Sequence, residues 1–270
     1  MRRLAAVGPQ AICSRWRTVA ALLFSIQGLA QPVVAQASLP PGLVYLRDVE
    51  SSIAQDIRYA SSDNFVGRPL PGYDAPECIL RREVALALKQ VQADLAGSGF
   101  ALKVYDCYRP TRAVRAMAQW ASDGRPAGIS KRFFPKLQKD GLFALGYIAA
   151  RSQHSMGTAV DLTLIERTSV PPARFDPGAR YGPCTGPASE RAPDTSLDMG
   201  TGYDCLDAMS HTASGAVSAE QRRRRNLLVA AMDRRGFRNY HREWWHFSYP
   251  GAVPLAAYDF PIRPRRGANE

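Results

Sequence analysis

Two short segments, about 90 residues apart in the chain, constrain the fold more than any other feature. The first, SQHSMGTAVD, runs from Ser152 to Asp161 and contains His154, and the second, EWWH, runs from Glu243 to His246. Two imidazoles and two carboxylates are the groups of a catalytic zinc site with a general base, because three protein ligands leave one coordination position open for water. Any fold that uses these groups together must bring the two segments side by side.

The residue types within these segments define candidate roles. His154, Asp161 and His246 would provide two nitrogen ligands and one oxygen ligand, and such a zinc centre keeps a net positive charge and remains a good Lewis acid. Glu243 lies three residues before His246. A helical turn would place the two side chains on one side, whereas a flat strand would point them to opposite faces. If they converge, Glu243 is the natural general base.

The N-terminal stretch has the pattern of a secretory signal peptide. An arginine-containing region precedes an apolar run, and a small-x-small pattern follows it; the residues are Arg2, Arg3, Arg15, Arg17, the run Val19 to Leu29, and Val33 to Ala35. We expect cleavage near Ala35, or alternatively Ala30, and export, most simply to the periplasm. The other interpretation is a membrane anchor, but a run of about 11 residues is short for a bilayer. We expect residues 1–35 to be removed and the mature chain not to insert into a membrane.

The charge does not identify a nucleic-acid-binding protein. The formal net charge is +11, and four of the basic residues belong to the N-terminal stretch. The one dense basic run is Arg222 to Arg225, which falls in a helical pattern and is interpreted as a solvated helix face. For an exported protein, anionic polymers of the cell envelope are a more natural encounter than nucleic acid.

Four cysteines follow the N-terminal stretch: Cys78, Cys107, Cys184 and Cys205. An even number in an oxidising compartment favours two disulfides, for which three connectivities exist. Pairing of Cys184 with Cys205 would close a loop rich in glycine and proline and leave Cys78 with Cys107. The spacing has no zinc-type C-x-x-C pattern, so a cysteine metal site is not expected.

Hydrophobic periodicity predicts helices and strands in an α+β arrangement. Helices are expected over Arg81–Ala96, over Thr111–Trp120, and from Ser218 to Gly236 with Gln221 completing a capping box. Strands are expected over Phe100–Asp106 and Gly157–Leu164, with a strand-like segment over Phe237–Tyr249. Ser169–Asp207 is a long loop. We expect one α+β domain over residues 40–262 and a flexible tail over 263–270.

Several motifs resemble a known peptidase family. The pattern S-x-H-x-x-G-x-A-x-D followed by E-x-W-H resembles the zinc D-Ala-D-Ala peptidases, which share their metal site with the N-terminal domain of Hedgehog proteins. The segment Tyr59–Tyr73 resembles the N-terminal signature of the VanX-type D-alanyl-D-alanine dipeptidases. Tyr105–Pro110 resembles their Asp-x-Tyr-Arg-Pro motif, and Asp198–Asp204 resembles their Met-Gly-Thr-x-Phe-Asp segment. The resemblance covers roughly Tyr59 to Tyr249, with the motifs in the family's order.

The resemblance implies a fold and a role for each matching residue. The fold would be a single α+β domain with a central, mostly antiparallel sheet flanked by helices. One Zn²⁺ would be held by His154, Asp161 and His246, with Glu243 as the catalytic base. The residues implied around the substrate are Arg109 at the oxyanion, Ser152 at the carboxylate, and Tyr59 and Asp204 at the ammonium group.

The expected function is zinc-dependent hydrolysis of D-Ala-D-Ala to D-alanine in cell-wall peptide metabolism, by a zinc-bound water that Glu243 activates. An alternative is a zinc D,D- or L,D-carboxypeptidase that trims longer peptidoglycan stem peptides, against which the Tyr59–Tyr73 signature argues. A third is a non-catalytic zinc or wall-binding protein, against which Glu243 and Arg109 argue. The loop from Pro171 to Thr195 looks like an elaboration of the family pattern and is expected to reshape the pocket mouth.

Overall fold

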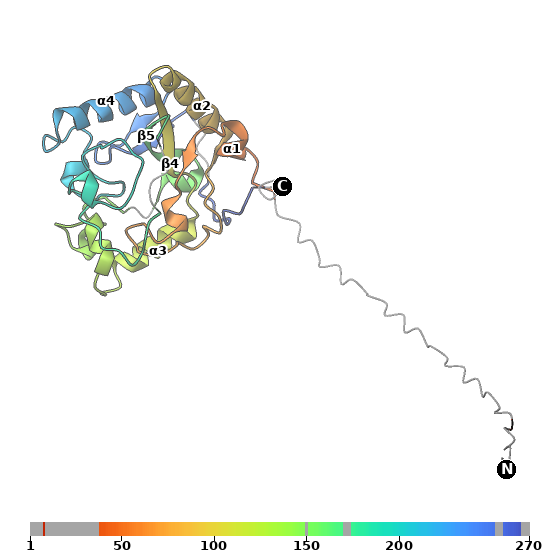
Figure 1. Ribbon diagram of the computed structural model, residues 1–270, viewed down its shortest axis with the longest axis horizontal. Coiled ribbons are helices and arrows are strands. Elements are labelled where there is room, and N and C mark those ends of the chain that lie inside the picture. Colours follow the sequence, from red (N-terminus) through yellow and green to blue (C-terminus); the bar gives the residue numbers. More distant parts are fainter. Residues whose placement is uncertain (1–7, 9–37, 149–150, 170–173, 252–255, 266–270) are drawn as a thin grey trace, which may run out of the picture. The chain divides into compact units, whose positions relative to one another are not determined.

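The computed structural model describes residues 8, 38–148, 151–169, 174–251 and 256–265 of the chain (Figure 1). The expected signal peptide, apart from Gly8, and residues 266–270 of the expected tail lie outside the described residues. Among the described residues, no helix has both the length and the apolar character that a membrane crossing requires. Residues 39–270 group as one unit by their contacts.

A five-stranded sheet organises this unit and positions the candidate site. Its strand order is β2-β4-β5-β7-β6, and only the β2–β4 pair is parallel. The strands are β2 (Ala54–Gln55), β4 (Phe100–Asp106), β5 (Ala159–Glu166), β6 (Arg238–Asn239) and β7 (His246–Ser248). The expected mostly antiparallel sheet is therefore confirmed, and β4 has the bounds that its alternating sequence predicts.

A smaller antiparallel pair joins β1 (Leu43–Tyr45) to β3 (Ile79–Arg81), and the short helix α1 (Leu46–Val49) follows β1 directly. Short 3₁₀ helices occur in the connections: η1 (Arg58–Ala60), η2 (Gly128–Phe133), η3 (Lys139–Gly141), η4 (Gln153–Met156), η5 (Ala188–Glu190) and η6 (Ala208–Ser210). Of these, η4 carries His154 into the site.

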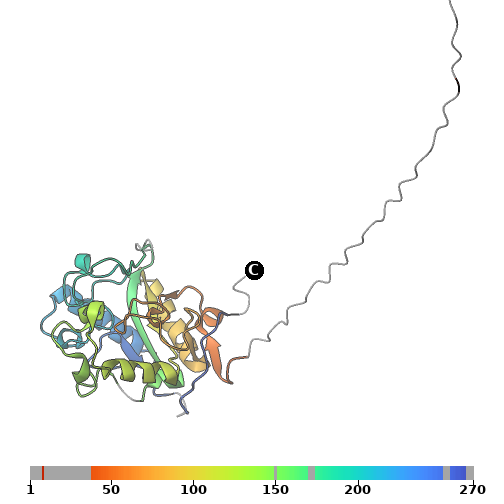
Figure 2. The same ribbon diagram turned by 90° about the horizontal axis from the view of Figure 1, so that it is seen from below.

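Three longer helices flank the sheet. Helices α2 (Arg82–Ala96) and α4 (Ala219–Asp233) lie along one side of the sheet, and α3 (Thr111–Ala121) lies on the other side (Figures 1 and 2). The start of α4 is fixed by the expected capping box: the Ser218 hydroxyl accepts from the Gln221 backbone N–H, and the Gln221 side chain accepts from the Ser218 backbone N–H. All three helices were expected from the periodicity.

The two faces of β4 and β5 have different characters because side chains alternate along a strand. Leu102, Val104, Leu162 and Leu164 are fully buried and occupy the face that packs on α2 and α4. The opposite face carries a line of polar groups at the intervening positions, Lys103, Tyr105, Asp161 and Thr163. The apolar face therefore builds the core, and the polar face is free to build a site.

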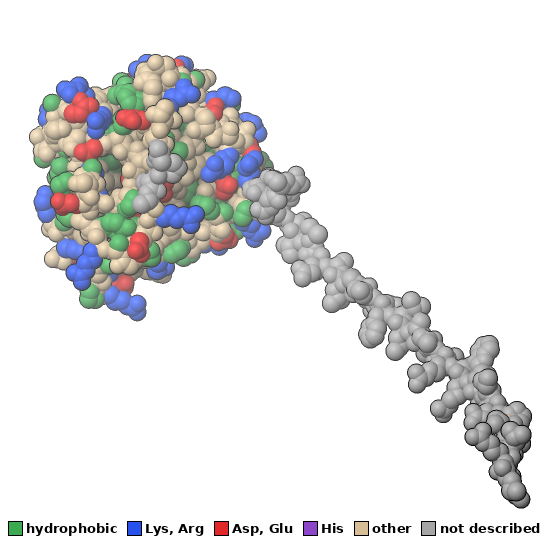
Figure 3. Space-filling view, viewed as in Figure 1, with side chains coloured by type: hydrophobic (Ala, Val, Ile, Leu, Met, Phe, Trp, Pro, Cys, Tyr) green, Lys and Arg blue, Asp and Glu red, His purple; other side chains and the backbone are tan. Residues whose placement is uncertain are grey.

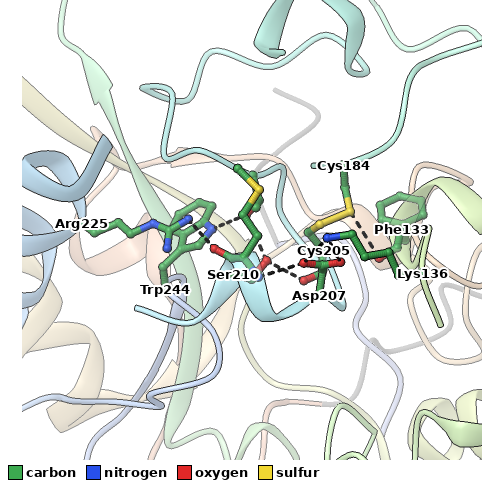
Figure 4. Close-up of a disulfide and its surroundings, with 10 residues drawn as sticks. Phe133, Lys136, Cys184, Cys205, Asp207, Ser210, Arg225 and Trp244 are labelled. Carbon is green, nitrogen blue, oxygen red and sulfur yellow. Dashed lines mark hydrogen bonds and ion pairs between the residues drawn. A yellow bond between two sulfur atoms is a disulfide. The ribbon is translucent and has the colours of Figure 1, made fainter. Parts of the chain in front are cut away.

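Two disulfides form with the pairing favoured from the sequence. Cys78 precedes β3 and is bonded to Cys107, which directly follows β4. Cys184 is bonded to Cys205 and closes part of the long loop (Figure 4). The first bond holds the end of β4 to the small sheet, close to the residues of the candidate site.

The structure corrects two expectations. The segment 237–249 is not one strand but two short strands, β6 and β7, separated by a turn. The run Arg222 to Arg225 is not wholly a solvated face, because Arg225 is fully buried and donates to the carbonyl oxygens of Met199, Met209 and His211. On the face that Figure 3 shows, lysine and arginine side chains are spread out, with acidic side chains among them.

Candidate metal centre

The register of the sheet brings the candidate ligands together. Asp161 on β5 lies opposite His246 on β7 and opposite Asp106 on β4. Directly opposed residues of antiparallel strands project to the same face, with their Cβ atoms about 4.5–5.5 Å apart. A shift in register or bulge between Val104 and Asp106 adjusts the end of β4 at this point. Strand pairing alone therefore places three polar side chains in one row.

His154 reaches the same point from η4. The Ser152 hydroxyl accepts from the backbone N–H of His154, and Gly157 ends the turn with a φ of 71°. A side chain at Gly157 would also meet Leu43, whose Cδ2 atom lies 2.8 Å from the position of an added Cβ. The Nδ1 atom of His154 lies 2.7 Å from the Cys107 carbonyl oxygen. Because a carbonyl only accepts, Nδ1 carries the proton and Nε2 has the lone pair that a metal needs.

The three candidate ligand atoms have the spacing of a tetrahedral zinc site. Asp161 Oδ1 lies 2.9 Å from His246 Nδ1 and 3.3 Å from His154 Nε2, and the two nitrogens are 3.2 Å apart. Zinc–ligand bonds of about 2.0–2.1 Å place tetrahedral ligands roughly 3.3 Å from one another. Two imidazoles and one carboxylate are also the donors that zinc prefers. The residues therefore fit a zinc ion in both geometry and chemistry.

The protonation state of Asp161 suits a ligand. Burial by itself raises the pKa of this carboxyl, but His154 and His246 outweigh burial and hold the pKa well below its ordinary value. The Asp161 side chain is almost inaccessible, so it is a buried anion stabilised by its neighbours. A metal cation would meet an ionised carboxylate and would not have to displace a proton from it.

Glu243 converges on the site because the chain turns before β7. The backbone N–H of Glu243 donates to Tyr240, and the N–H of His246 donates to Glu243. This turn places Glu243 Oε2 3.9 Å from His246 Nδ1, which settles the question that the sequence spacing left open. Burial raises the pKa of Glu243 to about 7, His246 opposes that rise, and the charge of Asp161 adds to it. A carboxyl with a pKa near neutrality can both accept and return a proton.

Arg109 follows β4 and borders the same site. Its guanidinium donates to Asp106 through Nε at 2.9 Å and approaches the same oxygen through Nη2 at 2.8 Å. Nη2 also lies 3.6 Å from Asp161 Oδ2, and the guanidinium carbon lies 4.9 Å from the centre of the Tyr59 ring. The side chain is therefore both part of a salt bridge and a cation at the site.

Tyr59 and Asp204 form a pair on another wall. The Tyr59 hydroxyl donates to Asp204 Oδ2 at 2.8 Å. Asp204 has a left-handed backbone, with a φ of 56°, which costs a non-glycine residue about 1 kcal/mol or more. Burial raises the pKa of Asp204 well above its ordinary value, and the nearby charge of Asp161 acts in the same direction. The fold therefore holds a strained, buried carboxyl group beside the candidate ligands.

All the residues predicted from the sequence border one cavity of about 540 Å³: Tyr59, Arg109, Ser152, His154, Asp161, Asp204, Glu243 and His246. The long loop behaves differently. Its segment Pro171–Thr195 was expected to reshape the mouth, but none of the described residues of that segment, 174–195, borders this cavity, and some of them enclose a separate cavity with Arg58 and Arg132. For the described residues, the expectation that this loop reshapes the mouth of the site is wrong.

Two buried side chains next to the site, Asp106 and Tyr203, were not predicted. Asp106 accepts from Arg109 and, at 2.6 Å, from the Tyr73 hydroxyl. The Tyr203 hydroxyl donates to Asp161 Oδ2 at 3.0 Å. Asp106 lies within the Tyr105–Pro110 motif, and Tyr203 directly precedes Asp204. The motifs contained both positions, but only the fold shows which partners they contact.

Comparisons with known proteins show what the chain is similar to. The model of the M15 peptidase family, described as D-Ala-D-Ala dipeptidase, matches residues 40–173 and 191–263. A D-alanyl-D-alanine dipeptidase of Enterococcus faecium is 30% identical over 82% of this chain and 98% of its own length. One from Enterococcus faecalis is 33% identical over 76% and 90%, respectively. A solved structure of a vancomycin-resistance D,D-pentapeptidase, VanY with Zn(II), matches at a TM-score of 0.33 and 15% identity, covering 74% of this chain and 88% of that one.

Proposed function

This chain belongs to the M15 peptidase family of D-Ala-D-Ala dipeptidases, and from that premise we propose that it hydrolyses D-Ala-D-Ala to D-alanine in cell-wall peptide metabolism. The observation that carries the proposal is the convergence of His154, Asp161 and His246, whose ligand atoms lie within 4.8 Å of one another. Glu243 borders the same cavity. A structural zinc site would be closed by a fourth protein ligand, whereas a set of three leaves room for chemistry.

In the proposed mechanism, His154, Asp161 and His246 would hold a zinc ion, which would supply Lewis-acid chemistry for a water and for the scissile carbonyl. The Glu243 carboxylate takes a proton from the attacking water and returns it to the amine that leaves. In the protein without metal, burial raises its pKa to about 7, and this burial favours return of the proton. Arg109 places a permanent cation where the carbonyl oxygen gains negative charge, and a well-aimed donor in such a position commonly contributes about 3–4 kcal/mol.

The remaining residues are proposed to recognise the two ends of the dipeptide. Asp204 is a buried carboxyl that a substrate ammonium group would stabilise in its ionised form, and Tyr59 holds its orientation by a hydrogen bond. Ser152 borders the cavity beside His154 and is proposed to contact the substrate carboxylate, although its hydroxyl already accepts from the His154 backbone. A pocket that pairs both charged ends disfavours longer peptides, because their extra residues leave a buried group unpaired.

We also propose that the mature protein acts outside the cytoplasm, in the periplasm, after removal of residues 1–35. The N-terminal sequence pattern supports export. The two disulfides support an oxidising compartment, since such bonds are rare where thiols are kept reduced. The matching test is the N-terminal sequence of the protein recovered from the periplasmic fraction.

The function is tested by metal analysis of the mature protein together with dipeptide assays. We expect one zinc per chain, turnover of D-Ala-D-Ala, no comparable turnover of L-Ala-L-Ala, and loss of activity after chelation that zinc restores. A chain that hydrolyses D-Ala-D-Ala equally well without metal would contradict the zinc mechanism. A chain that cleaves a pentapeptide stem but not the free dipeptide would be a carboxypeptidase instead.

A further inference from the structure

The two oxygens of the Asp161 carboxylate face different partners. Oδ1 lies among the imidazole nitrogens, 2.9 Å from His246 Nδ1 and 3.3 Å from His154 Nε2. Oδ2 points the other way and accepts from the Tyr203 hydroxyl at 3.0 Å. Only one of the two oxygens is therefore directed at the metal position, and the other already has a hydrogen-bond donor from the protein.

Tyr203 is held rigidly in this position. Its ring stacks on Tyr105, with the centroids 4.4 Å apart and the planes 16° apart, and it meets Trp245 edge-on at 5.6 Å. Tyr105 is fixed in turn by its own hydroxyl, which donates to Asp194 at 2.8 Å. Because both neighbours are buried, the Tyr203 hydroxyl cannot leave Asp161 by a simple side-chain rotation.

Arg109 is the other donor near this oxygen, but it is committed elsewhere. Its Nη2 atom lies 3.6 Å from Asp161 Oδ2, beyond a good hydrogen bond, and 2.8 Å from Asp106. The dipeptidase motif that this segment resembles has phenylalanine where this chain has Tyr203. Compared with that motif, this chain therefore has one additional hydrogen-bond donor at Asp161, the Tyr203 hydroxyl.

We propose that Tyr203 is a positioning residue for the metal centre: its hydroxyl occupies Asp161 Oδ2, so that Asp161 binds zinc through Oδ1 alone. The inference rests on the zinc site of the proposed function and deepens it. A carboxylate that turned both oxygens to the metal would take up the position that water and substrate need. A donor on the outer oxygen prevents this and fixes the orientation of the ligand.

The test is Tyr203→Phe, which keeps the ring and removes only the hydroxyl. We expect a roughly 10–100-fold weaker zinc affinity, measured by competition with a chelator, as for other partners of metal ligands. We also expect weaker visible absorption of the Co(II)-loaded variant, because a second carboxylate oxygen raises the coordination number. In assays with saturating zinc, kcat should fall while KM stays close to that of the parent.

Tyr105→Phe is the matched control. It removes a hydroxyl from the other member of the same stacked pair, and that hydroxyl contacts Asp194 and not Asp161. We expect it to lower stability but to leave zinc affinity and the Co(II) spectrum unchanged. Zinc affinity is measured at a temperature at which the metal-free parent and both metal-free variants are folded. The comparison then reports binding to folded protein.

The outcomes separate the possibilities. A loss of zinc affinity of less than about threefold in Tyr203→Phe would overturn the inference, given the size of effect expected for such partners. Equal losses in both variants would also overturn it, since they would show an effect of packing. If the unchanged protein binds no zinc, the proposed function itself fails. A large loss confined to Tyr203→Phe supports the positioning role.

Discussion

The Nδ1 atom of His154 lies 2.7 Å from the carbonyl oxygen of Cys107, whose side chain is bonded to Cys78. A disulfide thus holds the backbone group that sets the tautomer and the orientation of a candidate zinc ligand. Cys107 therefore contributes both to the stability of the protein and to the orientation of a metal ligand, although it does not itself contact the metal position.

Removing this disulfide is expected to weaken both properties. Cys78→Ser with Cys107→Ser should lower the free energy of unfolding by about 3–4 kcal/mol, from the loop of 29 residues that the bond closes. Zinc affinity should fall as well, because the Cys107 carbonyl is less firmly placed. Chemical denaturation and chelator competition measure the two effects.

The second disulfide provides the comparison. Cys184→Ser with Cys205→Ser removes a bond of similar separation, 21 residues, and should cost a similar free energy. Neither cysteine bonds to a candidate ligand, so zinc affinity should fall less than in the first double variant. Equal losses of zinc affinity in the two double variants would show that the Cys107–His154 contact has no special role.

Replacing Glu243 is expected to separate metal binding from turnover. Glu243→Ala removes the proposed base and none of the three candidate ligands, so zinc content should remain at one per chain. Turnover of D-Ala-D-Ala should fall by roughly 100- to 10,000-fold, the usual contribution of a general base. Metal analysis and kcat on one preparation test both expectations, and a variant that keeps its turnover would show that another group accepts the proton.

The partly buried carboxylate Asp194 predicts a pH-dependent stability. Burial alone raises its pKa, but Arg58 and Lys103 outweigh burial and bring it from 3.8 to about 2. Because the folded pKa lies below the unfolded one, the stabilisation is complete above about pH 4 and is lost as the pH falls towards 2. Asp194→Asn should cost at least about 2 kcal/mol at pH 7, since the shift is worth 1.36 kcal/mol per pKa unit and two buried cations lose a partner.

Denaturation curves at several pH values measure this dependence. The difference between the parent and Asp194→Asn should shrink below about pH 4 and keep falling through pH 2, where about half of the folded parent molecules have a protonated Asp194 carboxyl. Asp233→Asn is the control, because the Asp233–Arg238 pair is largely exposed and such pairs contribute little. A difference that is constant from pH 7 to pH 2 would mean that Asp194 acts through packing.

Much of the fold was predictable because local rules and packing agree. Val84, Leu88, Val91 and Leu95 follow a helical period, and all four are buried in α2. The alternation in Phe100–Asp106 corresponds to β4 residue for residue. The turn before β7 was not determined by spacing, because the convergence of Glu243 and His246 depends on backbone hydrogen bonds to Tyr240 and within the turn. For the same reason, the sequence pattern over 237–249 does not show that the segment forms two short strands with a turn between them.

The parts of the site that sequence reasoning missed depend on contacts between distant segments. Nothing in the spacing of residues along the sequence shows that Asp106 contacts Arg109 and Tyr73, or that Tyr203 contacts Asp161. Both positions also lie within motifs whose other residues have a more obvious chemical role. Their positions follow from sheet register and from the path of the 199–211 segment over the polar face of the sheet. Arg225 differs from its prediction for a related reason. Its charged neighbours in the sequence predict a solvated helix face, but in the fold its side chain is buried against carbonyl groups.

That buried arginine gives the last prediction. Arg225 donates to the carbonyl oxygens of Met199, Met209 and His211, which flank the segment with Tyr203 and Asp204, and Figure 4 shows it beside Trp244 and Ser210. Burial lowers its pKa to about 10, so it remains charged at neutral pH. Arg225→Met should destabilise the protein by about 3 kcal/mol or more, because the Met199 and Met209 carbonyls lose their donor and the His211 carbonyl keeps only the Ser214 N–H. It should also raise KM for D-Ala-D-Ala, since the segment that holds Asp204 loses its anchor.

Arg222→Met is the control, because Arg222 occupies an exposed position of the same helix, and it should change neither the stability nor KM. An Arg225→Met protein with the same stability and KM as this control would show that the three hydrogen bonds of Arg225 do not hold the segment in place.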